Sequence, residues 1–288
     1  MERIFFITVL VALSLVFCGC NQPQKTPKQK PKDLNITILL DLSNRINTSR
    51  NPEQWKYDTT NIKVIIEVFK SKIKNEPHLC RGKIRVQLLP PPSEGLNMNA
   101  IVSGLKFNCP GEAVKNKEIH DTIAKRYAQN LQEIYTQTIK ASNWQGRSDI
   151  WGFFQDEVDR CIEKDTSYRN ILVIFTDGYL RYDGRLDLKT VNTTSIQPDR
   201  IKKYRTPNWR VCIDNDNFSI DPCHDNLHNL EILVLEIKAE DPFVDEENIL
   251  IYLWEKWLKK MGVQKYKLLK SALPSDRKTD IEIFLNSK

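Results

Sequence analysis

The sequence lacks several patterns that would assign it directly to a common functional class. It has no dense run of lysine and arginine, and its net charge is only +6, from 43 basic and 37 acidic residues. A surface that follows a nucleic-acid backbone needs a concentrated basic patch, so nucleic-acid binding is not indicated. The ten glycines form neither a phosphate-binding loop nor a dinucleotide-binding fingerprint. No serine lies in the Gly-x-Ser-x-Gly context of a nucleophile elbow.

The N-terminal residues have the pattern of an export signal. One arginine precedes an apolar stretch at 4–17, which is too short to span a bilayer, and small and cysteine residues follow. Gly19–Cys20 resembles a bacterial lipobox, in which residues 1–19 are removed and Cys20 is lipidated. A plain secretory signal and a short anchor remain the alternatives.

The next segment, 20–33, is expected to be a flexible tether. From Asn21 to Asp33 it has no apolar residue except prolines, and lysines recur along it, so it cannot bury enough surface to fold. We therefore expect an exported protein of the bacterial cell envelope, anchored in a membrane by its N-terminal lipid, whose folded domain spans 34–288.

Within that domain, strand and helix patterns alternate. Near-continuous apolar runs predict buried strands, and apolar positions at helical spacing predict amphipathic helices. The expected strands are 34–41, 83–92, 100–107, 170–178 and 230–238, and the expected helices are 59–73, 116–142, 149–164 and 247–262. This alternation predicts an α/β fold with a doubly wound, mostly parallel sheet covered by helices on both faces. A long irregular insertion is expected at about 179–228, and such connections are usually functional or mobile.

Five cysteines remain after the signal, and an exported protein can form disulfides. Cys212 with Cys223 and Cys80 with Cys109 are the expected pairs, because each pair brackets a loop-like segment. Cys161 lies in an apolar helical register and is expected to be a buried free thiol.

Polar oxygens gather where the predicted strands end. Asp41 and Asp177 each follow a buried strand, Ser43 comes just after Asp41, and Ser148 lies in the loop before a helix. Ligands collect at the carboxyl ends of parallel strands. Oxygen donors without histidine or thiolate suit a hard cation such as Mg²⁺.

The order of these motifs resembles the von Willebrand factor A (vWA) domain. Asp41 and Ser43 match the start of its Asp-x-Ser-x-Ser motif, Ser148 falls where the family often has threonine, and Asp177 matches its last aspartate. The resemblance implies a metal-ion-dependent adhesion site for Mg²⁺, Mn²⁺ or Ca²⁺. It also implies that the bound cation accepts an acidic side chain of a partner protein. On this resemblance the chain is a binding protein and not an enzyme. Arg45 stands in place of the second serine, and a guanidinium has no lone pair for a cation.

Three further residues are candidates for binding. Arg45 either pairs with Asp41 or Asp177 or clamps a partner's carboxylate. Arg147 adds a second positive charge near the site, and Trp209 in the insertion is a candidate exposed contact.

Other functions stay open at this point. A metal-dependent hydrolase could use the same carboxylates, although no general base or nucleophile is evident. A structural module with a decayed metal site is a further alternative, and the substitution at Arg45 favours it. A zinc set is also conceivable from Cys212, Cys223, His224 and His228, but the spacing matches no familiar zinc module.

Overall fold

The structure is a computed structural model that describes most of the chain. The described residues are 31–90, 98–141, 148–181, 193–240, 243 and 245–287. The predicted signal, the lipidation site Cys20, most of the tether, and Arg147 lie outside them. The folded unit runs from Lys32 to Lys288.

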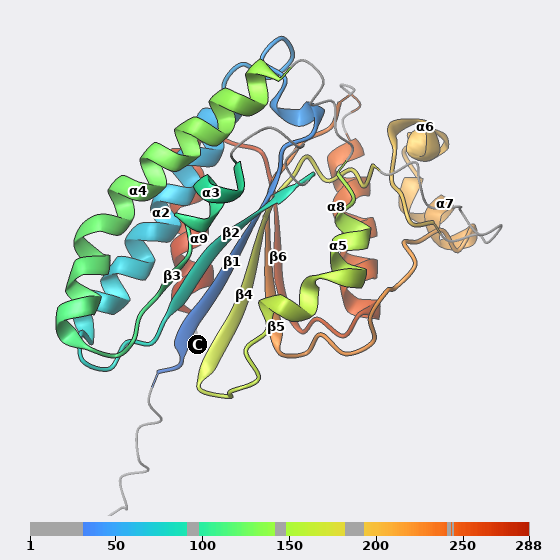
Figure 1. Cartoon of the computed structure of the whole chain (residues 1–288). Coiled ribbons are helices and arrows are strands. Elements are labelled where there is room, and N and C mark those ends of the chain that lie inside the picture. The colour runs from blue at the N-terminus through green and yellow to red at the C-terminus, as the bar shows by residue number, and fades with distance from the viewer. Residues whose placement is uncertain are drawn as a thin grey trace, which may run out of the picture. The chain divides into compact units, whose positions relative to one another are not determined.

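A six-stranded sheet with the order β3-β2-β1-β4-β5-β6 forms the centre of this unit (Figure 1). All neighbouring strands are parallel except β2 and β3, which are antiparallel. The strands are β1 (Asp33–Asp41), β2 (Lys83–Leu89), β3 (Phe107–Asn108), β4 (Tyr168–Phe175), β5 (Leu230–Ile237) and β6 (Lys265–Lys270). The chain builds the sheet outward from β1 in one direction and from β4 in the other, so the predicted doubly wound fold class is confirmed.

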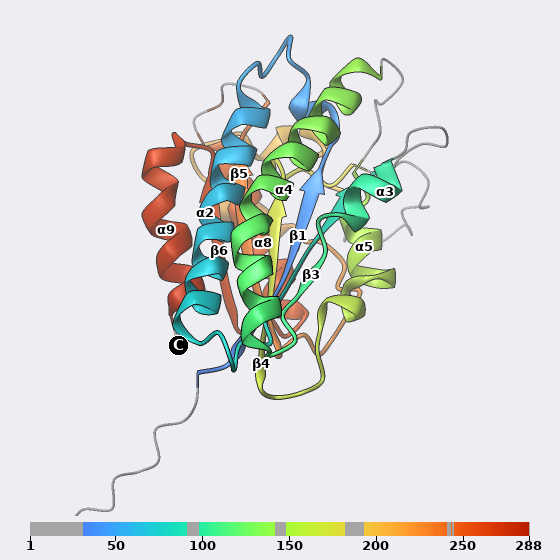
Figure 2. The same cartoon turned by 60° about the vertical axis from the view of Figure 1, so that its left-hand side comes forward.

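Helices cover both faces of the sheet. Figure 2 shows α2 (Gln54–Asn75), α4 (Ala113–Lys140) and α9 (Pro274–Asn286) side by side over one face. The opposite face carries α5 (Ile150–Asp156) and α8 (Glu246–Lys260) (Figure 1). Two buried apolar clusters result, one on each side of the sheet. None of the helices in the described ranges is both long enough and apolar enough to cross a membrane.

Burial explains why the central strands read as continuous apolar runs. Residues 34–41 of β1 are all buried, as are six consecutive residues of β4. Both faces of a central strand meet helices, so an apolar side chain is favoured at every position. β2, next to the short edge strand β3, alternates between buried and half-buried residues.

Several parts of the domain differ from the sequence prediction. The helix expected at 149–164 ends at Asp156, as α5, and the 3₁₀ turn η2 (Val158–Cys161) follows it. The strand expected at 100–107 is instead the helix α3 (Met98–Ser103), followed by the two-residue strand β3. Short apolar runs do not distinguish strand from helix by periodicity. The elements β6 and α9 were not predicted. The residues of β6 are all half-buried and alternate lysine with apolar or aromatic side chains.

The insertion is more ordered than expected over its described part. It contains α6 (Pro198–Ile201), the 3₁₀ turn η3 (Lys202–Tyr204) and α7 (Trp209–Asn215). It also adds buried side chains to the core on the α8 side, among them Tyr204 and Ile213.

Candidate functional site

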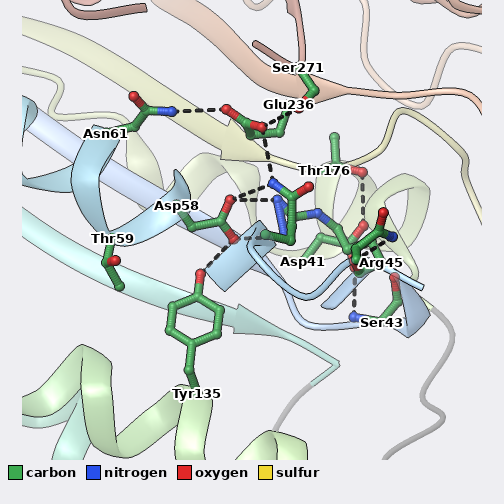
Figure 3. Close-up of polar contacts among 12 residues, drawn as sticks. Asp41, Ser43, Arg45, Asp58, Thr59, Asn61, Tyr135, Thr176, Glu236 and Ser271 are labelled. Atoms are coloured by element: carbon green, nitrogen blue, oxygen red, sulfur yellow. Dashed lines mark hydrogen bonds and ion pairs between the residues drawn. The ribbon is translucent and has the colours of Figure 1, made fainter. Parts of the chain in front are cut away.

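The direction of chain winding reverses between β1 and β4, and the predicted site lies where these two strands end. Asp41 is the last residue of β1. Its Oδ2 accepts a hydrogen bond of 2.8 Å from the hydroxyl of Thr176, just beyond β4, and its Oδ1 accepts one of 2.9 Å from the backbone N–H of Ser43 (Figure 3). A reversal point of this kind is where open α/β sheets bind ligands. The structure therefore brings two of the predicted motifs together.

Asp177 completes the pair of carboxylates. Its Oδ1 accepts a hydrogen bond of 3.1 Å from the N–H of Tyr179. The tight turn depends on Gly178, whose φ of +93° disfavours other residues and whose added Cβ would come within 3.1 Å of Ile237. Burial, and then the neighbouring charge of Asp41, raise the pKa of Asp177 to about 7. The two carboxylates are thus close enough to repel each other.

Ser148 is held in place by the start of α5. The next residue, Asp149, caps this helix by accepting a hydrogen bond of 2.7 Å from the N–H of Gly152. The carbonyl of Ser148 accepts a bond of 3.3 Å from the N–H of Arg181, which ties the loop to the segment after β4. The Ser148 hydroxyl is buried and has no hydrogen-bond partner among the described residues. Such an atom is costly unless a ligand satisfies it.

The side chain of Arg45 does not pair with a carboxylate of the proposed cation site. It is 4% exposed and lies in the 3₁₀ turn η1 (Asn44–Ile46). Its guanidinium donates two hydrogen bonds to Asp58 on α2, of 2.7 and 2.9 Å (Figure 3). The predicted pairing with Asp41 or Asp177 is therefore wrong, because the ion pair that Arg45 forms is with Asp58. The alternative role of clamping a partner's carboxylate stays a prediction; in this structure the guanidinium is buried against Asp58.

A buried polar network surrounds this ion pair. Asp58 also accepts hydrogen bonds from the hydroxyl of Tyr135, at 2.7 Å, and from Gln54, at 3.2 Å. Burial raises the pKa of Asp58 to about 6, although Arg45 acts in the opposite direction. Gln54 also donates to the carboxylate of Glu236, a residue of β5 that has a φ of +73°. The other donors to Glu236 are Asn61 and Ser271.

Arg181 is a site residue that the sequence analysis missed. Its Nη2 lies 3.9 Å from Asp177 Oδ2, but it contacts Glu240 more closely. The described guanidinium groups near the site, those of Arg45 and Arg181, thus each have a closer carboxylate partner elsewhere. Among the described residues of the site and its network, two guanidinium groups face five carboxyl groups, namely Asp41, Asp58, Asp177, Glu236 and Glu240. Within this set, carboxyl groups outnumber guanidinium groups.

The donor set at the strand ends fits a hard cation. It offers the carboxylates of Asp41 and Asp177 and the hydroxyls of Ser43 and Ser148, all of them oxygen donors of the kind that Mg²⁺ and Mn²⁺ accept. Over the part of the chain that the structure describes, no three His, Cys, Asp or Glu side chains gather as a metal-binding group. The conceivable zinc set of the insertion is therefore not assembled.

The predicted disulfide between Cys212 and Cys223 is not formed. The Sγ of Cys212 lies 4.0 Å from the hydroxyl of Thr206, whereas the Sγ of Cys223 lies 3.7 Å from the Sδ of Met261. The two thiols thus face different neighbours and are not joined to each other.

The other three cysteines of the folded unit are free and buried. Cys161 is a fully buried thiol, as predicted. Cys80 and Cys109 are not bonded, but their thiols interact. This interaction lowers the pKa of Cys80 and, together with burial, raises that of Cys109.

Trp209 holds the insertion against the core. Its ring is partly buried and packs edge-on against Tyr252 of α8, with centroids 5.5 Å apart. The guanidinium of Arg210 lies 5.2 Å from the Trp209 ring and 5.0 Å from the Tyr252 ring. Trp209 therefore has a packing role, and its part in binding a partner stays a prediction.

Comparisons with known proteins give fold-level likenesses only. No protein-family model matches the chain, and no curated protein matches its sequence. Proximal thread matrix protein 1 from the mussel byssus is 10% identical, with 89% of this chain and 48% of that chain covered and a TM-score of 0.38. The pilus adhesin SpaC from Lactobacillus rhamnosus GG is 11% identical, with 90% and 30% covered and a TM-score of 0.41. BatB from Bacteroides thetaiotaomicron is 11% identical, with 88% and 100% covered and a TM-score of 0.35.

This chain thus spans about half the length of the mussel protein. Likenesses this distant carry no functional argument. The proposals below rest on the residues of this chain.

Proposed function

We propose that this chain is a vWA-like interaction module that binds a protein partner through a divalent cation. Asp41, Ser43, Ser148 and Asp177 would hold the cation, with Mg²⁺ as the first candidate and Mn²⁺ or Ca²⁺ as alternatives. One observation carries the proposal. Among the described residues, the carboxylates of Asp41 and Asp177 lie close enough to repel each other where β1 and β4 end, and the buried hydroxyl of Ser148, in the loop before α5, has no hydrogen-bond partner.

The charge balance supports a cation at this place. Within the described ranges no guanidinium forms an ion pair with Asp41, and Arg181 lies closer to Glu240 than to Asp177. Two buried carboxylates that repel each other are stabilised when a cation lies between them. When bound, the cation supplies a Lewis-acidic position that accepts a carboxylate oxygen from the partner. Asp177, at 8% exposure, is the most accessible of the four residues.

Export and anchoring belong to the same proposal and rest on the N-terminal sequence. Lipid on Cys20 would attach the chain to a membrane of the bacterial envelope, with the tether leading to Asp33. Asp33 starts β1 and Asp41 ends it, so the chain enters the folded unit at the end of β1 opposite Asp41. Nine residues of strand separate Asp33 and Asp41 by about 27 Å.

Calorimetric titration of Mg²⁺, and then Mn²⁺, into the full chain in detergent tests the proposal. We expect saturable binding that is lost in Asp41→Ala. Asp121→Ala is the matched control, because Asp121 is an exposed aspartate on α4. Loss of binding in Asp41→Ala with retention in Asp121→Ala would support the cation site. Absence of binding by the parent chain, or equal binding by Asp41→Ala, would overturn it.

A further inference from the structure

We infer that Asp58 decides whether the site binds a cation, although it does not touch the site, because it holds the positive charge of Arg45 away from Asp41 and Asp177. This inference rests on the proposed cation site and extends it to a residue in the middle of the chain. The aspartate would act as a positioning residue through its salt bridge, and not as a ligand.

Arg45 lies where its charge can affect cation binding at the proposed site. It stands two residues after Ser43, in the turn that follows β1, and a hydrogen bond of 3.1 Å from Asn51 to its carbonyl fixes that turn. The charge of Arg45 is close enough to act on both Asp41 and Asp177. A guanidinium turned toward those carboxylates would compete directly with a cation.

The structure directs Arg45 elsewhere. The two terminal nitrogens of the Arg45 guanidinium, Nη1 and Nη2, both donate to Asp58, whose side chain is fully buried. Tyr135 of α4 and Gln54 of α2 fix the orientation of that carboxylate (Figure 3). A carboxylate held from two helices is a preformed counter-ion, and a bidentate pair is directional. The charge of Arg45 is thus compensated before any cation arrives.

Removing the counter-ion should redirect the guanidinium. A buried guanidinium without a carboxylate is strongly unfavourable. Once Asp58 is neutral, Asp41 is the next carboxylate on which Arg45 acts most strongly. Arg45 would then neutralise the proposed ligand, and the cation would bind more weakly.

Two variants that break the same pair separate this electrostatic role from a merely structural one. Asp58→Asn leaves the positive charge uncompensated, whereas Arg45→Gln removes it. We expect Mg²⁺ to bind about tenfold more weakly, or worse, to Asp58→Asn, because a unit charge lies nearer a divalent cation. We expect Arg45→Gln to bind as tightly as the parent or more tightly. The double variant should return to within about threefold of the parent.

The titrations use the full chain, with unfolding curves recorded for every variant. Tyr135→Phe is the control, since it removes one hydrogen bond to Asp58 and changes no charge; we expect a change of less than about threefold. A similar loss in Asp58→Asn and Arg45→Gln would mean that the pair only shapes the turn, and would overturn the inference. Unchanged binding by Asp58→Asn would also overturn it.

The result for the parent chain distinguishes failure of the proposed function from failure of this inference. If the parent binds no cation, the proposed function fails and this inference fails with it. If the parent binds and loses binding on Asp41→Ala, the site stands and only the comparison of variants decides the role of Asp58. Should Asp58→Asn not fold, a tenfold loss in Arg45→Gln would still overturn the inference, and retained binding would support it.

Discussion

The hydroxyl of Thr176 donates a hydrogen bond of 2.8 Å to Oδ2 of Asp41, and joins the ends of two strands that lie 135 residues apart in the sequence. The same hydroxyl accepts a bond of 3.2 Å from the N–H of Gly178. Thr176 is therefore fully engaged, whereas the hydroxyl of Ser148 has no partner in the part of the chain that the structure describes. This contrast distinguishes a residue that builds the site from one that awaits a ligand.

Replacing Ser148 with alanine should leave the apoprotein intact. Since the buried hydroxyl makes no hydrogen bond, we expect the free energy of unfolding without Mg²⁺ to be unchanged or higher by up to about 1 kcal/mol. Added Mg²⁺ should raise the Tm of the parent but not of Ser148→Ala. Unfolding curves with and without Mg²⁺ measure both effects. A clear loss of stability in the apoprotein would show that the hydroxyl has a structural partner.

Thr176→Val should behave in the opposite way. It removes the donor to Asp41, so we expect the apoprotein to lose about 1–2 kcal/mol of unfolding free energy. The shape of valine keeps the packing close to that of threonine, which isolates the hydrogen bond. Denaturant unfolding of Thr176→Val beside Ser148→Ala provides the comparison, and equal stability of the two variants would contradict the assignment.

Loss of Arg45 should destabilise the fold in a pH-dependent way. In Arg45→Met, the buried charge of Asp58 has lost its guanidinium partner. We expect the free energy of unfolding to fall by about 3–5 kcal/mol at pH 8. Arg45 lowers the pKa of Asp58, so removing it raises that pKa above its value of about 6. Below the new pKa the carboxylate is protonated in the folded state, and the loss should shrink toward pH 5.

The raised pKa of Asp58 also fixes the direction in which the stability of the parent changes with pH. The folded-state pKa of Asp58 is raised from 3.8, so its contribution to stability is present below about pH 4 and is lost as the pH rises through about 6. Urea unfolding of the parent and Arg45→Met at pH 5 and pH 8 tests both statements. The double variant Arg45→Met/Asp58→Leu is the control, and its stability should vary less with pH. A loss of equal size at both pH values would show that Asp58 does not titrate as described.

Cys80 and Cys109 should form a disulfide when the protein is oxidised. Their thiols already interact, and exchange with oxidised glutathione would join the two sulfurs and reduce glutathione to its thiols. The bridge closes a loop of roughly 30 residues, and we expect the Tm to rise by about 5–10 °C. Peptide mapping by mass spectrometry should find Cys80 joined to Cys109 and no bridge between Cys212 and Cys223. Free thiols at Cys80 and Cys109 after oxidation would contradict this prediction.

Trp209→Ala should weaken the fold without changing cation binding. Its half-buried ring packs on Tyr252, so we expect a loss of about 1–3 kcal/mol of unfolding free energy. Val211→Ala on the same helix is the matched control, since Val211 is 57% exposed and should cost less than about 0.5 kcal/mol. Unchanged stability in Trp209→Ala would restore the original expectation of an exposed contact.

Several features of this protein could be predicted from local sequence. The strands that became β1, β4 and β5 were predicted because a strand covered on both faces is apolar at every position. The carboxylates Asp41 and Asp177 stand out because they interrupt or follow such runs. β6 and α9 were not predicted, since the lysine-rich β6 has no continuous apolar run and lies half-buried at the edge of the sheet.

The fold class, the strand ends that carry Asp41 and Asp177, and the serines near them follow from local sequence, because periodicity and residue type are local properties. The direction of the Arg45 side chain depends instead on how distant elements pack. Its partner Asp58 lies 13 residues away on a helix, and nothing in the sequence marks that aspartate as buried. A buried charge takes whichever opposite charge the packing of distant elements brings within reach, and that choice exists only once the helices and the sheet have assembled.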